Sequence, residues 1–162
     1  MLLLNCRTKK TNAVIPIPEC KGVPKYIRLT GFEPRKPFAF TIGERGGAVG
    51  LSLIQFKTEE SQEKRFAYPS WSSAGNLGAV ITDKQGNNYV IPRPFINTLK
   101  NEPKKQNIIY RVDTYTGLMS PFFELPAENQ NEATNPFGLL GITQDCESGN
   151  LFASTVFGST VT

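Results

Sequence analysis

This chain has few of the residue types that usually take part in catalysis or metal binding. Histidine is absent, and the three cysteines, Cys6, Cys20 and Cys146, lie far apart in the sequence. Without histidine there is no His-dependent triad, no imidazole proton shuttle and no His-ligated metal. Cysteines without close spacing do not make a zinc or redox motif. The sequence therefore predicts no catalytic residues, no metal and no cofactor, and it favours a protein that is not an enzyme.

Two loops hold candidates for ligand binding. Trp71 and Asn76 lie in "WSSAGN", and Asn135 and Phe137 lie in "NPFG", each loop just before an apolar run. Aromatic rings give stacking area, and side-chain amides give directed hydrogen bonds. The alternative is that Trp71 packs in the core and that Asn135 starts a turn.

The glycine-rich loop "GERGG" is a further candidate, because Glu44 and Arg45 could contact an anion there. It lacks the lysine and the following helix of a phosphate loop, so a hairpin turn is favoured. The basic residues elsewhere are scattered in short clusters, although the formal net charge is +4. Without a basic stripe the sequence predicts no nucleic-acid partner.

The first residues, "MLLLNC", resemble the cleavage box of bacterial lipoproteins, with Leu3 placed three residues before Cys6. The resemblance implies that Cys6 carries lipid, that the protein is in the cell envelope or extracellular, and that it meets a membrane only through this anchor. Cys20 and Cys146 then remain as an even pair that an oxidising compartment allows to form a disulfide. The alternative is a cytoplasmic protein with a short hydrophobic first strand.

Short runs rich in β-branched and aromatic residues follow, most of them bounded by Gly, Pro, Asn or Asp. No segment keeps a helical apolar period beyond about two turns. We therefore expect a signal remnant or tether over residues 1–23 and an all-β domain over residues 24–162, with the charged segment Lys57–Arg65 as an exposed loop. The expected strands are "YIRLT", "PFAFTIG", "AVGLSLIQF", "LGAVITD", "NYVIP", "IIYRVD", "MSPFFEL", "FGLLGIT" and "LFASTVF".

One hairpin and one repeat organise these strands. In "RVDTYTG" the Asp113 carboxylate is expected to accept backbone hydrogen bonds two or three residues on, while Gly117 supplies a positive φ. The stretches that start at Leu77 and Leu139 share an apolar strand, an aspartate, a polar turn and a second strand. One period holds four expected strands, at 77–82, 88–92, 107–112 and 118–125. Antiparallel four-stranded units repeated radially are the blades of a β-propeller; a β-sandwich is the alternative.

On these residues the chain resembles the bacterial six-bladed propellers of the NHL and SMP-30-like kind, in which "D-x-x-T-G" marks the outer hairpin of a blade, as in Asp113 to Gly117. The resemblance implies a partial β-propeller whose loops before Leu77 and Leu139 face the channel mouth. It also implies a non-catalytic binding or scaffold protein for a small ligand, a carbohydrate or another protein. The alternatives are a metal-dependent propeller hydrolase of lactonase or esterase type and a β-sandwich adhesin subunit. Because propellers close with about 4–8 blades, we expect an N-terminal portion of a longer product.

Overall fold

The computed structural model describes residues 20–33, 36–42, 49–56, 62–93, 103–126, 137–155 and 158–161. These residues form an all-β protein, as the sequence predicts, and their only helices are three short 3₁₀ helices. None of the three is long and apolar enough to cross a membrane. The strands are β1 (Phe38–Thr41), β2 (Ser52–Gln55), β3 (Lys64–Phe66), β4 (Leu77–Thr82), β5 (Asn88–Pro92), β6 (Ile108–Val112), β7 (Met119–Glu124), β8 (Gly141–Gln144), β9 (Leu151–Thr155) and β10 (Gly158–Val161). The helices are η1 (Lys25–Leu29), η2 (Pro69–Ser72) and η3 (Pro103–Asn107).

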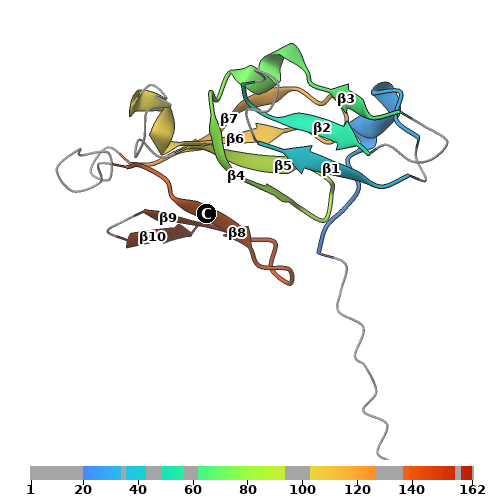
Figure 1. The fold of residues 1–162 in the computed structure, drawn as a ribbon. Helices are drawn as coiled ribbons and strands as arrows, with labels where there is room; N and C mark the ends of the chain where they lie inside the picture. The colour runs from blue at the N-terminus through green and yellow to red at the C-terminus, as the bar shows by residue number, and fades with distance from the viewer. Residues whose placement is uncertain are drawn as a thin grey trace, which may run out of the picture.

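The strands form three antiparallel sheets in which each strand pairs with its neighbour along the chain (Figure 1). The first sheet has the order β1-β2-β3, the middle sheet β4-β5-β6-β7, and the third sheet β10-β9-β8. The prediction that four strands between Leu77 and Leu125 form one unit is confirmed, because they are the middle sheet in the expected order. The expected restart after Leu139 corresponds to the third sheet.

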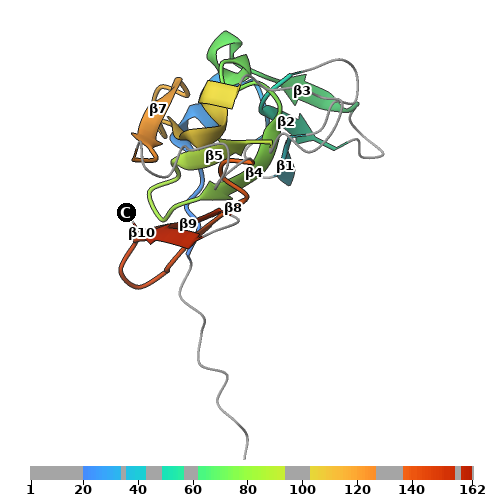
Figure 2. The same ribbon diagram turned by 90° about the vertical axis from the view of Figure 1, so that its left-hand side faces the viewer.

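The middle sheet lies between the other two sheets (Figures 1 and 2), and apolar clusters cover both faces of β4, β5 and β6, whereas most of β7 is exposed. Successive side chains of a strand point to opposite faces. Val80 and Val90 belong to an apolar cluster shared with the first sheet, whereas Ile81 and Ile91 belong to a cluster shared with the third sheet. All five residues of β5 are therefore buried, which explains the nearly unbroken apolar run "NYVIP".

Aromatic side chains fill the space between the first and middle sheets. Trp71 packs edge-on against Tyr26, with ring centroids 5.7 Å apart, and against Phe66, with centroids 6.0 Å apart. The Tyr26 hydroxyl donates a hydrogen bond to Oδ1 of the buried Asn88, so this polar pair is satisfied inside the core. Burial raises the pKa of Tyr26 far above its usual value, and the phenol stays neutral.

Two of the expected elements are wrong. The run "YIRLT" is not a strand but forms η1, in which the adjacent residues Tyr26 and Ile27 are both buried. Successive side chains of a strand point to opposite faces, so a strand covered on one face cannot bury two adjacent residues. The chain therefore forms a helical turn here. The segment Lys57–Arg65 is not a loop throughout, because Lys64 and Arg65 belong to β3. That strand pairs with β2 because Phe66, opposite Leu53, is its one core residue, and a single apolar residue gives no visible alternation.

Gly117 illustrates how the β6–β7 turn is made. Its φ is +69°, and an added Cβ would collide with the Tyr68 ring. We expect Gly117→Ala to lower the free energy of unfolding by about 2–4 kcal/mol, because left-handed backbone strain and overpacking add together. Urea denaturation followed by circular dichroism measures the change.

Gly31 provides the matched control for this substitution. Its φ is +72°, but no atom lies within 4 Å of the position that an added Cβ would take. Gly31→Ala should therefore carry only the backbone strain, about 1 kcal/mol. Equal losses for the two variants would show that contact with Tyr68 does not matter.

Candidate functional site

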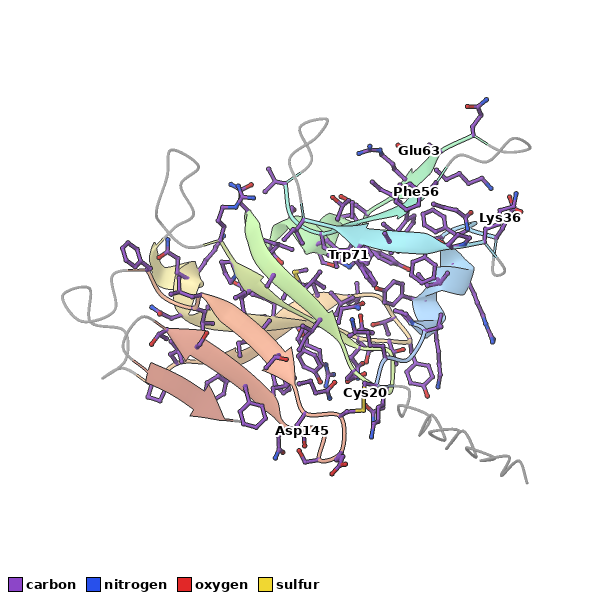
Figure 3. The ribbon with its side chains drawn as sticks, turned by 60° about the horizontal axis from the view of Figure 1, so that its bottom comes forward. Cys20, Lys36, Phe56, Glu63, Trp71 and Asp145 are labelled. Carbon is purple, nitrogen blue, oxygen red and sulfur yellow. A yellow bond between two sulfur atoms is a disulfide. The ribbon has the colours of Figure 1, made fainter. Side chains whose placement is uncertain are left out.

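Trp71 lies in the core and does not present a binding surface. Its side chain is fully buried, and Figure 3 shows it among packed side chains. The candidate role of its ring as a stacking platform for ligand is therefore wrong, and the alternative that Trp71 packs in the core is confirmed. The physical reason is that the indole Nε1–H donates to the carbonyl oxygen of Gly117 at 2.7 Å. The large ring can therefore be buried without leaving its hydrogen-bond donor unsatisfied.

Two other predicted binding residues lie at the entries to strands. Asn76 comes just before β4, and Phe137 comes shortly before β8, and both are half-buried. The carbonyl oxygen of Asn76 accepts a hydrogen bond from the N–H of Arg93 at 2.7 Å, which closes the loop at this end of β4. The remaining predicted binding and lipidation residues lie outside the described residues and stay predictions: Glu44, Arg45, Asn135 and Cys6.

The β4–β5 and β6–β7 turns lie at the same end of the middle sheet, because alternate reversals of an antiparallel meander share an end. We call this the turn end. The segment Cys20–Tyr26, which we call the strap, runs across it. The N–H of Gly22 donates to the carbonyl oxygen of Asp83 at 2.7 Å, and the N–H of Tyr26 donates to that of Thr114 at 2.8 Å. The first residues of the strap, which the sequence assigned to a tether, are thus bound to the sheet.

A disulfide joins the strap to the third sheet. Cys20 and Cys146 are bonded, with their Cα atoms 5.1 Å apart, and Cys146 lies in the β8–β9 turn. Figure 3 shows the bond near Asp145, whose carboxylate accepts a hydrogen bond from the N–H of Ser148 at 2.9 Å. Hydrogen bonds from the Ser148 hydroxyl and N–H hold the pKa of Asp145 below its usual value. The strap therefore links three turns that belong to two different sheets.

Asp83 and Asn87 couple the two turns of the middle sheet. Asp83 Oδ1 accepts a hydrogen bond from the N–H of Asn87 at 2.8 Å, and Asp83 Oδ2 accepts one from Nδ2 of the same residue at 2.8 Å. Asn87 Oδ1 in turn accepts from the N–H of Thr114 at 2.9 Å. The Tyr89 hydroxyl also donates to Asp83 Oδ2, at 3.3 Å. Burial, and then the charge of Asp83, raise the pKa of Tyr89, so the phenol stays protonated.

Asp113 holds the β6–β7 turn in the way that the sequence predicts. Its Oδ1 accepts hydrogen bonds from the N–H of Tyr115 at 3.0 Å and from the N–H of Thr116 at 2.9 Å. The Thr116 N–H is the main reason that the pKa of Asp113 lies below its usual value; the Thr116 hydroxyl and the Tyr115 N–H add to it. The carboxylate is a structural acceptor that stays charged.

The lowered pKa of Asp113 predicts a pH-dependent contribution to stability. A group whose pKa is depressed in the folded state stabilises it above the unfolded-state pKa, and this contribution is lost as the pH falls through the folded-state pKa. Asp113→Asn keeps the Oδ1 acceptor but removes the charge. We expect the variant to melt below the parent at neutral pH, and the difference to shrink between about pH 5 and about pH 2. Thermal unfolding across this range tests it, and a constant difference would contradict it.

An open cleft of about 440 Å³ lies between the strap and the two turns. Lys25 Nζ donates to the Tyr115 hydroxyl oxygen at 2.6 Å and lies 4.1 Å from the ring centroid. Arg111 Nη2 lies 3.8 Å from Asp113 Oδ2, and Lys84 is exposed on the opposite turn. Among the residues that the structure describes, three cations and one carboxylate thus line the cleft. The other lining residues are Gly22, Val23, Gln85, Asn87 and Thr114.

Sequence reasoning did not single out the cations of this cleft. A local signal was present for two of them, because Lys84 directly follows Asp83 and Arg111 stands two residues before Asp113. Side chains next to two turn aspartates at the same end of a meander are expected to converge. Lys25 had no such signal, because the strap that carries it reaches the turns only in the folded chain.

Comparison with known proteins does not extend this description. No protein-family model matches the chain, no curated protein matches its sequence, and no solved structure matches its fold. The function is therefore inferred from the geometry of the cleft and of the sheets around it.

Proposed function

We propose that this protein is a non-catalytic binding module whose ligand occupies the turn-end cleft. The observation that carries the proposal is that the cleft offers exposed cations and an exposed ring while its carboxylate is already engaged. Asp113 accepts three hydrogen bonds on Oδ1 and faces Arg111 through Oδ2. A general acid or base near neutral pH needs a pKa close to the working pH, and the pKa of Asp113 is shifted the other way.

The proposal includes a propeller-like arrangement of the three sheets. Two observations support it: the middle sheet is a four-stranded meander in which β4 to β6 are covered on both faces, and β4 contacts β8. In a propeller the first strands of successive blades approach one another around a central axis. In a simple two-sheet sandwich one face of each sheet meets solvent, so the coverage of β4 to β6 on both faces favours the propeller-like arrangement over the sandwich.

The proposal also includes the cell envelope as the location, with lipid on Cys6. The Cys20–Cys146 disulfide supports an oxidising compartment, because such bonds are rare where thiol reductants are abundant. Labelling of cells with a radioactive fatty acid, compared between the parent and Cys6→Ser, tests the anchor. Equal labelling of the two proteins would contradict the lipid anchor on Cys6, and the proposed binding role would stand.

A combined ligand and activity screen tests the binding role. We expect the purified protein to retain a ligand from a saccharide and peptide array, to contain no bound divalent metal, and to leave lactones and esters intact. Retention should fall in Lys84→Gln, whereas Lys64→Gln, on the first sheet, serves as a matched control. Bound metal together with turnover would overturn the proposal and favour the propeller hydrolase. Ligand retention that is unchanged by Lys84→Gln would place the binding surface elsewhere.

A further inference from the structure

We infer that the turn-end cleft takes an acidic saccharide, in which a carboxylate or sulfate group meets the lysines and a sugar ring lies on Tyr115. This inference rests on the proposed binding role and adds the chemical class of the ligand. Three observations support it: the positive charge of the cleft, the exposed ring of Tyr115 beside that charge, and the disulfide that holds the strap in place.

The charge of the cleft is only partly balanced by the described residues, in which Arg111 faces Asp113 and the charge of Lys84 helps to lower the pKa of Asp145. No carboxylate in the described part of the chain lies within 4.0 Å of Lys25 Nζ or Lys84 Nζ. Arg111 is 3.8 Å from its carboxylate partner, longer than a good charge-assisted hydrogen bond. Cations that converge on a partly enclosed space with low-dielectric walls concentrate a positive potential there. An anionic group is the ligand part that this potential attracts.

The aromatic ring of Tyr115, next to these cations, favours a sugar over a bare anion as the ligand. The Tyr115 side chain is 64% exposed and stands in the cleft wall, with Lys25 Nζ over one part of its ring. An aromatic face next to hydrogen-bonding groups suits a ring that has both C–H and O–H surfaces. The volume of about 440 Å³ lies within the range of roughly 300–1,000 Å³ that small-ligand sites occupy.

The walls of the cleft are held in place before any ligand arrives. The strap, which carries Lys25, is fixed by the Cys20–Cys146 bond and by backbone hydrogen bonds to Asp83 and Thr114. Asn87 ties the turn that carries Lys84 to the turn that carries Tyr115. A preformed site loses little conformational entropy on binding, so a few charged contacts give measurable affinity.

Isothermal titration calorimetry with defined oligosaccharides tests the inference on the full chain. The acidic probes are trigalacturonate and a heparin-derived tetrasaccharide; the neutral probe is the galactose trimer that matches trigalacturonate. We expect both acidic probes to bind, the neutral trimer not to bind, and added salt to weaken binding. Lys84→Gln should lower the affinity for the acidic probes about tenfold, which corresponds to about 1.4 kcal/mol. Lys64→Gln, a lysine that lies away from the cleft, should leave it unchanged.

Further arms separate an acidic saccharide from a simple anion. Tyr115→Ala should weaken trigalacturonate but should not weaken the binding of inorganic sulfate, because it removes the ring and releases Lys25 Nζ. If sulfate binds as well as the saccharides, or if Tyr115→Ala has no effect, the saccharide assignment is wrong and the cleft is an anion site. If the neutral trimer or an uncharged peptide binds in the cleft, the acidic class is wrong while the binding role stands. Failure of both acidic probes at millimolar concentration also overturns the inference.

Discussion

Replacing Trp71 with alanine is expected to lower the free energy of unfolding by about 3–5 kcal/mol. The ring is fully buried and packs against Tyr26, Phe66 and Tyr68 between the first and middle sheets. Its removal leaves a cavity where these sheets meet and deprives the carbonyl oxygen of Gly117 of its indole donor. Because domains of this kind are stable by about 5–15 kcal/mol, the loss is a large part of the total. Urea denaturation followed by far-ultraviolet circular dichroism is the measurement, since Trp71 is the only tryptophan.

Two companion variants keep this prediction testable if Trp71→Ala does not fold. Trp71→Phe retains much of the packing but lacks the Nε1–H donor, so we expect a smaller loss of about 1–3 kcal/mol. Phe56→Ala is the control for an exposed ring, because the Phe56 side chain is 53% exposed, and it should change stability by no more than about 0.5 kcal/mol. A Trp71→Ala loss no larger than that of Phe56→Ala would contradict the buried position of Trp71.

Removing the Cys20–Cys146 disulfide is expected to cost about 4–5 kcal/mol. The bond links positions 126 residues apart, and in the chain-entropy model a cross-link over so long a loop strongly restricts the unfolded chain. It also fixes the strap, so its loss should loosen Lys25 at the cleft. The double variant Cys20→Ser with Cys146→Ser, compared with the oxidised parent by urea denaturation, measures the change in stability.

Reduction of the parent protein is an independent test of how much the Cys20–Cys146 disulfide stabilises the fold. A thiol reductant should lower the unfolding midpoint of the parent toward that of the double serine variant and should not shift the variant itself. The parent should also migrate differently in denaturing gels with and without reductant, whereas the variant should not. Equal stability of parent and variant would mean that the bond does not constrain the unfolded chain.

The turn chemistry could be predicted because it is local. Asp113 bonds to backbone groups two and three residues away, and Gly117 adopts a positive φ, so both features depend on a stretch of five residues. The four-stranded order of the middle sheet was predictable for a related reason. Each strand pairs with the next one along the chain, and the alternation of apolar residues marks each strand separately.

The position of Trp71 could not be predicted from its own neighbourhood. For a tryptophan in the Ser-rich loop "WSSAGN" the sequence favours a core residue but leaves an exposed platform open. The choice depends on Gly117, the partner of its indole N–H, which is 46 residues away. The same holds for η1, where the Tyr26 N–H finds its acceptor, the carbonyl oxygen of Thr114, in the β6–β7 turn.

The sequence by itself determined the all-β class, the strand order within the middle sheet and the aspartate turns, because each of these depends on contacts between residues close in the chain. Only the tertiary structure decided that Cys20 meets Cys146 and that Lys25, Lys84 and Arg111 line one cleft. The physical reason is that these groups are brought together by the stacking of whole sheets and by the strap across them. No spacing in the sequence records how far apart separate segments lie once the core between them is packed.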